Sequence, residues 1–273
     1  MGIMRTLVTM IVIAVPLFSE PDAALPGARI KLQFPELPKT LFALFFERDS
    51  TPQLYIALPQ NYSPDRQFPL FVYLYGGDGG EGAGPGRGMD IMEGRDCIFV
   101  NMPLFKAKFD TNEPYKGRLI SIEKDKEVIC RAYTVMLKKV YETIPNIDTG
   151  NNIISGESNG AHSIAAIFEN GDTYLMGLFR NIILAEGGYF YIKTYERYKD
   201  KNILYVYGDY EGINDWMGRK MRADLPLVIQ KFAAAMETNR LNATPLIMTN
   251  TGHEVPKRFY PDIRRWVSAQ LKK

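Results

Sequence analysis

Hydrophobic positions along the chain fall into two patterns, short apolar runs and longer stretches with helical spacing. The short runs do not alternate between apolar and polar residues, which is typical of strands that are buried on both faces of a sheet. They predict strands at 41–49, 53–59, 68–75, 97–103, 151–155, 181–188, 202–209 and 244–250. The first two runs are separated by Ser-Thr-Pro, which predicts a hairpin at the start of the sheet.

Helical spacing is clearest between residues 123 and 144, where the apolar side chains share one face and lysines and a glutamate face outward. Further helices are predicted at 161–169, 222–239 and 261–273. Strands that alternate with helices predict an α/β fold, with a mostly parallel central sheet and helices on both of its faces. Residues 25–273 contain no repeat or linker pattern, so we expect a single domain there.

The N-terminal segment has the pattern of an export signal. Arg5 precedes an apolar run at 7–18, and small residues follow up to Ala24. A basic region, an apolar region and an alanine-rich cleavage zone predict a signal peptide over residues 1–24. The apolar run is shorter than the roughly 20 residues that a spanning helix needs. We therefore expect a secreted or periplasmic protein with no stable membrane span in its mature form.

Charge and cysteine content limit the kinds of partner. The chain has 33 basic and 31 acidic residues, a net charge of +2, and this balance does not indicate a nucleic-acid partner. Its two cysteines, Cys97 and Cys130, are compatible with one disulfide or with two buried thiols, and the pattern leaves both alternatives open. Neither cysteine nor histidine has the spacing of a zinc site, so no metal is expected.

A candidate nucleophile lies in Gly-Glu-Ser-Asn-Gly, between a predicted strand and a predicted helix. In this context the pattern G-x-S-x-G is typical of a nucleophile elbow, a sharp turn that exposes Ser158 Oγ above the sheet. The flanking Gly156 and Gly160 remove side chains that would collide with the neighbouring strand and helix. Taken alone, the pentapeptide also fits an ordinary turn, because Gly and Ser are good turn formers.

The chain has two histidines that could act as general base for this serine. His253 lies on a loop directly beyond the last predicted strand, whereas His162 lies on the helix that follows Ser158. The chain order serine, acid, histidine expected of such a fold favours His253.

Three carboxylates could orient that histidine, and all of them lie at or just beyond the end of the strand predicted at 202–209. We favour Glu211, which is far enough beyond the strand to turn toward a histidine loop, and place Asp215 second. Asp209 lies within the turn itself, where aspartate is favoured for local hydrogen bonds.

A glycine-rich segment follows the third predicted strand and contains a formal G-x-G-x-x-G at Gly77, Gly79 and Gly82. It does not follow the first strand, and its Ala-Gly-Pro-Gly continuation is not expected to open a helix, so we expect no nucleotide cofactor. We interpret the segment as an oxyanion loop, in which the N–H of Gly77 or Asp78 acts together with that of Asn159.

Four separated motifs, LYGGDGG, GESNG, YGDYEGIND and GHEVP, together resemble the α/β-hydrolase superfamily. The likeness is greatest to its exported serine esterases, including the polyhydroxybutyrate-depolymerase-like group, and covers about residues 41–273. It implies the α/β-hydrolase fold, with Ser158 as nucleophile, His253 as general base and Glu211 as triad acid. Two features depart from the family pattern: Tyr-Gly replaces the usual His-Gly before the oxyanion loop, and the acid is Glu instead of the commoner Asp.

This resemblance implies a serine hydrolase that cleaves carboxylic esters through an acyl-enzyme, with no cofactor. The expected partner is a small-molecule or polysaccharide-linked ester, and acetyl, feruloyl, short acyl and polyester substrates all stay open. A serine peptidase of the same fold is the first alternative. The second is a hydrolase-fold protein that has lost activity and binds polysaccharide.

Overall fold

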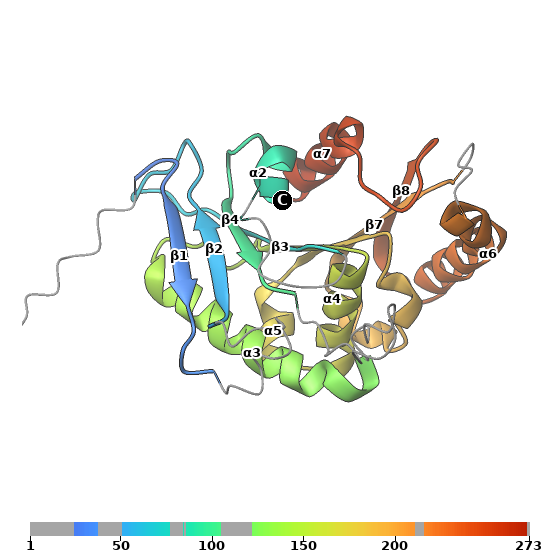
Figure 1. Cartoon of the computed structure of the whole chain (residues 1–273), viewed down its shortest axis with the longest axis horizontal. Coiled ribbons are helices and arrows are strands. Elements are labelled where there is room, and N and C mark those ends of the chain that lie inside the picture. Colours follow the sequence, from blue (N-terminus) through green and yellow to red (C-terminus); the bar gives the residue numbers. More distant parts are fainter. Residues whose placement is uncertain are drawn as a thin grey trace, which may run out of the picture.

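The computed structural model describes residues 25–37, 51–76, 84, 86–104, 122–210 and 216–271 of the chain (Figure 1). The side chains of 122–125, 190 and 216–225 are not described. The predicted signal peptide at 1–24 and the predicted strand at 41–49 lie outside the described residues.

Among the described residues, eight strands form one sheet in the order β1-β2-β4-β3-β5-β6-β7-β8. The first two pairs along this order are antiparallel and all the others are parallel, so the sheet is mostly parallel, as predicted. The predicted hairpin is a correction, because β2 pairs with β1 on one side and with β4 on the other, not with the partner predicted at 41–49. The strands are β1 (Arg29–Gln33), β2 (Gln53–Ala57), β3 (Leu70–Leu74), β4 (Ile98–Met102), β5 (Ile153–Glu157), β6 (Asn181–Ala185), β7 (Asn202–Gly208) and β8 (Asn242–Met248).

Strand β1 was not predicted from the sequence. It lies at the edge of the sheet, pairs with β2, and alternates between exposed and half-buried positions along Arg-Ile-Lys-Leu-Gln. An edge strand has only one strand neighbour and needs little apolar surface, so it lacks the continuous hydrophobic run that marks the central strands.

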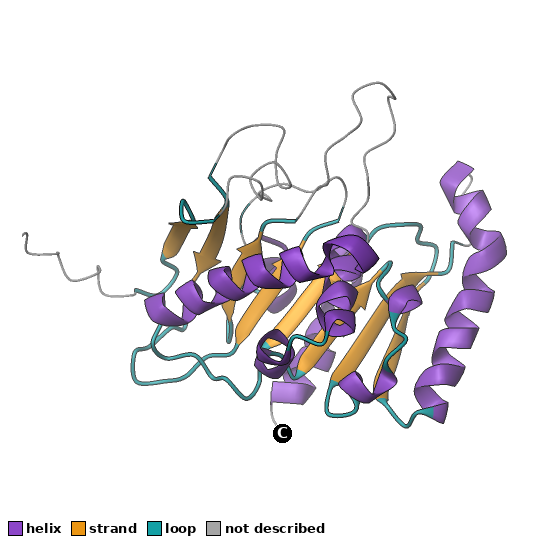
Figure 2. Cartoon of the chain, turned by 90° about the horizontal axis from the view of Figure 1, so that it is seen from below, coloured by secondary structure: helices purple, strands orange, loops and turns teal. Residues whose placement is uncertain are grey.

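Helices cover both faces of the sheet, as Figures 1 and 2 show. The core on one face includes side chains from α3 (Ile122–Thr143), α4 (Asn159–Asn170), α5 (Thr173–Leu178) and α6 (Trp216–Thr238). The core on the other face includes side chains from α2 (Gly86–Met92) and α7 (Tyr260–Leu271). Short 3₁₀ turns complete the structure at Tyr189–Tyr191, Tyr195–Tyr198 and Lys257–Phe259.

Helix α2 corrects one expectation, because the glycine-rich segment does lead into a helix. Gly86 is its first residue, and Gly88 packs against the aromatic ring of Phe71, where its missing side chain allows the helix to approach the sheet. A Cβ at Gly88 would lie 3.1 Å from that ring.

Strand β3 illustrates why the central strands are continuously apolar. All five of its residues are buried. Leu70, Val72 and Leu74 belong to the core beneath α3 and α4, whereas Phe71 and Tyr73 belong to the core beneath α2 and α7. Because each face of the strand meets a layer of helices, neither face can carry polar residues.

The parallel strands all end at the same edge of the sheet, where ligands bind in open α/β folds. Ser158 and Glu186 directly follow β5 and β6, and His253 follows β8 by a short loop. The backbone N–H of Ser158 donates to the carbonyl of Ala185 at 2.8 Å, so the ends of β5 and β6 are joined at this edge.

Candidate active site

Ser158 lies in a strained turn between β5 and α4. Its φ of 52° and ψ of −116° fall outside the regions that a residue with a side chain normally adopts. Such a backbone costs about 1–3 kcal/mol and persists only where the surrounding structure enforces it. The two glycines of the motif allow the close packing around it. A Cβ at Gly160 would lie 2.2 Å from the carbonyl oxygen of Leu74, and one at Gly156 would lie 2.6 Å from the backbone of Gly160.

Replacing Gly160 by alanine is therefore expected to destabilise the protein by about 3 kcal/mol or more, because the methyl group would overlap rigid backbone of β3. Urea denaturation measures this change in the free energy of unfolding. Gly177→Ala is the matched control, since Gly177 lies in α5 and a Cβ added there would meet only open space. The control should be neutral or slightly stabilising. Equal stability of the two variants would contradict the steric explanation.

The ring of His253 lies directly against the serine. Its Nε2 is 2.7 Å from Ser158 Oγ, a hydrogen-bond distance. Two hydrogen bonds hold the loop that carries it at Thr251: the N–H of Tyr210 donates to the carbonyl of Thr251 at 2.9 Å, and Arg258 donates to the Thr251 hydroxyl at 2.7 Å. The structure thus brings together two residues that are 95 positions apart in the chain.

The carboxylate beside this histidine is Glu186, which the sequence analysis did not consider. Its Oε2 lies 3.5 Å from His253 Nδ1, and its side chain is 1% exposed. The hydroxyl of Tyr210 donates to Oε2 at 2.9 Å and also lies 3.3 Å from His253 Nδ1, while the N–H of Gly208 donates to Oε1. Burial raises the pKa of Glu186, and the hydrogen bonds from His253, Gly208 and Tyr210 offset part of that rise.

The three carboxylates proposed from the sequence have different outcomes. Glu211 and Asp215 lie outside the described residues. The backbone N–H of Asp209 donates to the carbonyl of Met248, and its side chain accepts a long 3.5 Å hydrogen bond from the N–H of Thr251. Both contacts join Asp209 to the end of β8 and the loop that follows it, and neither is a local contact within its own turn. The segment does contribute to the site, but through Tyr210.

A sequence signal for Glu186 did exist. The run Asn-Ile-Ile-Leu-Ala-Glu-Gly-Gly has a single carboxylate at the carboxyl end of a buried parallel strand, where active-site side chains gather. The chain order serine, acid, histidine is met by Glu186 as well, one strand earlier than the segment that follows β7.

The other histidine packs on α4. The ring of His162 lies edge-on to the ring of Tyr191, with 5.0 Å between the ring centroids. Burial, and secondarily the charge of His253, lowers the pKa of His162 to about 4. This imidazole is therefore neutral near pH 7.

Of the predicted oxyanion donors, Asn159 is described and the two others are not. Asn159 is buried and is the first residue of α4, so its backbone N–H belongs to the first turn of that helix. Such N–H groups favour a negative charge at the helix start. Gly77 and Asp78 lie outside the described residues.

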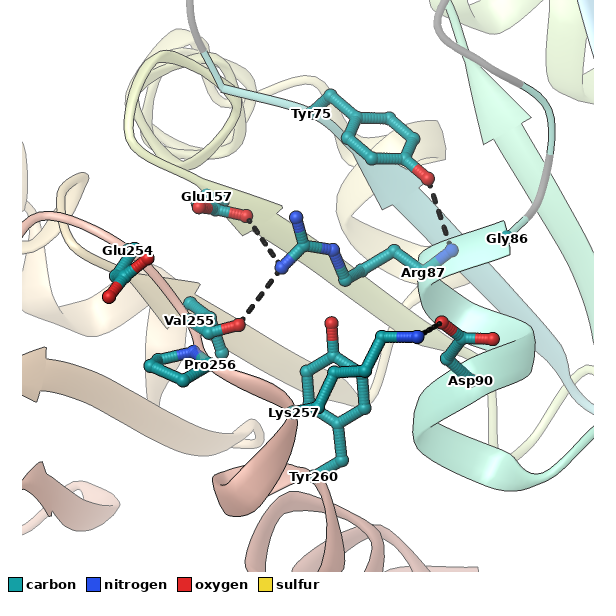
Figure 3. Close-up of a pocket in the computed structure, with 10 residues that line it drawn as sticks. All are labelled: Tyr75, Gly86, Arg87, Asp90, Glu157, Glu254, Val255, Pro256, Lys257 and Tyr260. Atoms are coloured by element: carbon teal, nitrogen blue, oxygen red, sulfur yellow. Dashed lines mark hydrogen bonds and ion pairs between the residues drawn. The ribbon is translucent and has the colours of Figure 1, made fainter.

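A pocket of about 450 Å³ lies beside the nucleophile turn and the histidine loop (Figure 3). It is bounded by Glu157, which precedes Ser158, and by Glu254, which follows His253. Five of its ten lining residues are charged, and two pairs of opposite charge lie among them, Arg87 with Glu157 and Lys257 with Asp90. The lining residues are Tyr75, Gly86, Arg87, Asp90, Glu157, Glu254, Val255, Pro256, Lys257 and Tyr260.

Other chemistry in the described part of the chain is limited. Cys97 and Cys130 are both buried and free, which agrees with the second of the two alternatives for these cysteines. The described residues contain no group of three His, Cys, Asp or Glu side chains arranged to hold a metal ion. No helix among them has the length and apolar character needed to span a membrane.

Known structures with a similar backbone include both esterases and peptidases. Esterase 2 of Thermogutta terrifontis, phosphorylated by paraoxon, aligns with a TM-score of 0.55 and 12% identity over 90% of this chain and 94% of the esterase. Fungal esterases of Rhizomucor miehei give a TM-score of 0.53 and 14% identity over 90% of this chain and 85% of theirs.

An acylaminoacyl peptidase of Pyrococcus horikoshii aligns with a TM-score of 0.59 and 12% identity over 91% of this chain. The chain spans only 42% of that peptidase, and 60% of a further thermostable esterase. No protein-family model matches the sequence, and no curated protein sequence matches it. The strand order, the helices on both faces and these structural neighbours agree: the chain has the α/β-hydrolase fold.

Proposed function

We propose that this protein is a serine hydrolase that cleaves carboxylic esters. The observation that carries the proposal is the contact of 2.7 Å between Ser158 Oγ and His253 Nε2, with Glu186 at the other ring nitrogen. A serine hydroxyl is a weak nucleophile until an adjacent base accepts its proton, and that base works best when a third group orients it. Ser158, His253 and Glu186 have this relationship.

In the proposed reaction, Ser158 Oγ attacks the ester carbonyl while His253 Nε2 accepts its proton. Glu186 accepts a hydrogen bond from His253 Nδ1–H and stabilises the imidazolium that forms. The N–H of Asn159 donates to the tetrahedral oxyanion, and Gly77 or Asp78 is our candidate for a second donor. His253 then returns the proton to the leaving alcohol. In the second half of the reaction, water attacks the acyl-enzyme while His253 Nε2 accepts its proton. His253 then returns that proton to Ser158 Oγ, and the acid is released.

The charged pocket beside the turn favours a polar substrate. A long alkyl chain in that pocket would remove Arg87, Asp90 and Lys257 from water without replacing their hydration. Short acyl groups, or esters carried on hydroxyl-rich carbohydrate chains, avoid this cost. We also retain the proposal that the protein is exported, since residues 1–24 have the pattern of a signal peptide.

A serine peptidase is the alternative within the same chemistry, because the attack and the oxyanion are common to ester and amide substrates. Its support is the likeness to the acylaminoacyl peptidase, of which this chain spans less than half. An inactive polysaccharide-binding protein is less well supported. The strained backbone of Ser158 has a cost in stability that a purely binding role would not require.

A serine-directed fluorophosphonate tests the proposed function. We expect one covalent adduct on the intact protein, located at Ser158 by peptide mass spectrometry, and loss of p-nitrophenyl acetate hydrolysis in proportion to labelling. Labelling in the presence of a peptide aldehyde would separate peptidase from esterase activity. A low concentration of the aldehyde should protect Ser158 from the fluorophosphonate only if the site binds peptides. An unlabelled protein that hydrolyses no short ester would contradict the proposal.

A further inference from the structure

Arg87, the second residue of α2, contacts two segments of the candidate active site with one nitrogen. Its Nη1 donates to the carbonyl of Val255 at 3.0 Å and lies 3.5 Å from Glu157 Oε2 (Figure 3). Glu157 directly precedes Ser158, and Val255 follows His253 by two residues. One guanidinium therefore bridges the nucleophile turn and the histidine loop.

Tyrosine hydroxyls hold both Glu157 and Arg87 in place. The hydroxyl of Tyr73, on β3, donates to Glu157 Oε2 at 3.0 Å, which holds the carboxylate from the sheet side. The backbone N–H of Arg87 donates to the hydroxyl of Tyr75 at 3.0 Å, which holds the start of α2 in place. The Arg87 side chain is only 25% exposed and that of Glu157 15%, so water screens their attraction less than it would at the surface.

The bridge lies next to the loop whose position sets the distance between His253 and Ser158. His253 is carried by a loop, and the hydrogen bond of its ring to Ser158 Oγ depends on where that loop lies. A displacement of about 1 Å in a catalytic group can lower the rate about a hundredfold. Without Arg87, the carbonyl of Val255 would lose this donor, and the half-buried carboxylate of Glu157 would lose its adjacent positive charge.

We propose that Arg87 is a positioning residue, which sets the spacing between the nucleophile turn and the histidine loop so that Ser158 Oγ and His253 Nε2 meet. It does not contact the reacting atoms. This inference rests on the proposed function, because it assigns the bridge a role in that reaction.

Arg87→Met tests the bridge, since methionine removes the charge and the donors but keeps an unbranched apolar stem. The matched control is Arg264→Met. Arg264 is 27% exposed and pairs with Glu93, so it joins α7 to the segment that follows α2 without contacting the nucleophile turn or the histidine loop. Two quantities are measured for each full-length variant: kcat and KM with p-nitrophenyl acetate, and hydrogen–deuterium exchange of the peptide covering 251–260.

We expect Arg87→Met to lower kcat about tenfold or more while KM changes little, because the alignment of reacting groups is lost and binding is not. Exchange in 251–260 should rise in Arg87→Met and stay near the wild-type rate in Arg264→Met. If Arg87→Met matches Arg264→Met in both kcat and exchange, the positioning role is overturned. If the wild-type protein hydrolyses no ester, the proposed function fails by itself, and the exchange comparison still decides whether Arg87 holds the loop.

Discussion

Replacing Ser158 by alanine is expected to lower kcat for p-nitrophenyl acetate by roughly 10⁴–10⁶-fold. Alanine removes the hydroxyl that His253 Nε2 contacts and that attacks the carbonyl, so no acyl-enzyme can form. Residual hydrolysis would come from the oxyanion donors acting on a bound water. Alanine and serine both carry a Cβ, so the strained turn should be equally costly in both proteins and the unfolding free energy should change little.

Ser163→Ala is the matched control for this result. Ser163 is buried on α4, and its hydroxyl donates to the carbonyl of Asn159 within the helix. Its loss should change kcat by about threefold at most, as is usual for a hydrogen bond within a helix away from the reacting atoms. Steady-state kinetics on purified proteins measures both variants. A Ser158→Ala protein with near wild-type kcat would show that another nucleophile performs the reaction.

Replacing Glu186 by glutamine should lower kcat by about 10²–10⁴-fold, the second largest effect that we expect. Glutamine has nearly the same shape, and its carbonyl oxygen can still accept the hydrogen bond from the N–H of Gly208, while its NH2 group takes the place of the oxygen that accepts from the Tyr210 hydroxyl. It lacks the negative charge that stabilises the imidazolium of His253 in the transition state. Since that charge matters most when the proton has moved, kcat should fall far more than KM rises.

Glu211→Gln is the decisive comparison, because the resemblance of the sequence implied Glu211 as the acid. If Glu186 orients His253, Glu211→Gln should keep kcat within about threefold of wild type, as is usual for a substitution that removes no catalytic group. The opposite ranking, a large loss in Glu211→Gln and a small one in Glu186→Gln, would return the role to Glu211. Circular dichroism of both variants checks that each kcat refers to folded protein.

Much of the fold follows from local patterns in the sequence. Apolar runs predicted seven of the described strands, because strands covered by helices on both faces are mostly apolar. The edge strand β1 was missed for the same reason, since it needs apolar residues on one side only. β8 does have an apolar run, although it is the other edge strand and most of its residues are exposed or half-buried. The serine turn was also predictable, because its two glycines are required by backbone that lies too close for any side chain.

The histidine could be selected from the sequence because the alternatives were few. There are two histidines in the chain, and only His253 follows a strand at the edge of the sheet where Ser158 lies. The acid could not be selected in that way. Several carboxylates follow strands, and chain order does not say which of them points toward the histidine.

The tertiary structure decided which carboxylate and which arginine lie at the histidine loop. Ser158 and Glu186 directly follow the neighbouring strands β5 and β6. His253 lies on the loop after β8, on the far side of β7, and this loop brings its ring next to both residues. Arg87 meets the carbonyl of Val255 from 168 positions away. The sequence by itself determined the α/β order of elements, the nucleophile turn and the histidine loop, because each depends on residues close together in the chain. Which acid and which arginine reach that loop depends on the order of strands in the sheet, which no local pattern specifies.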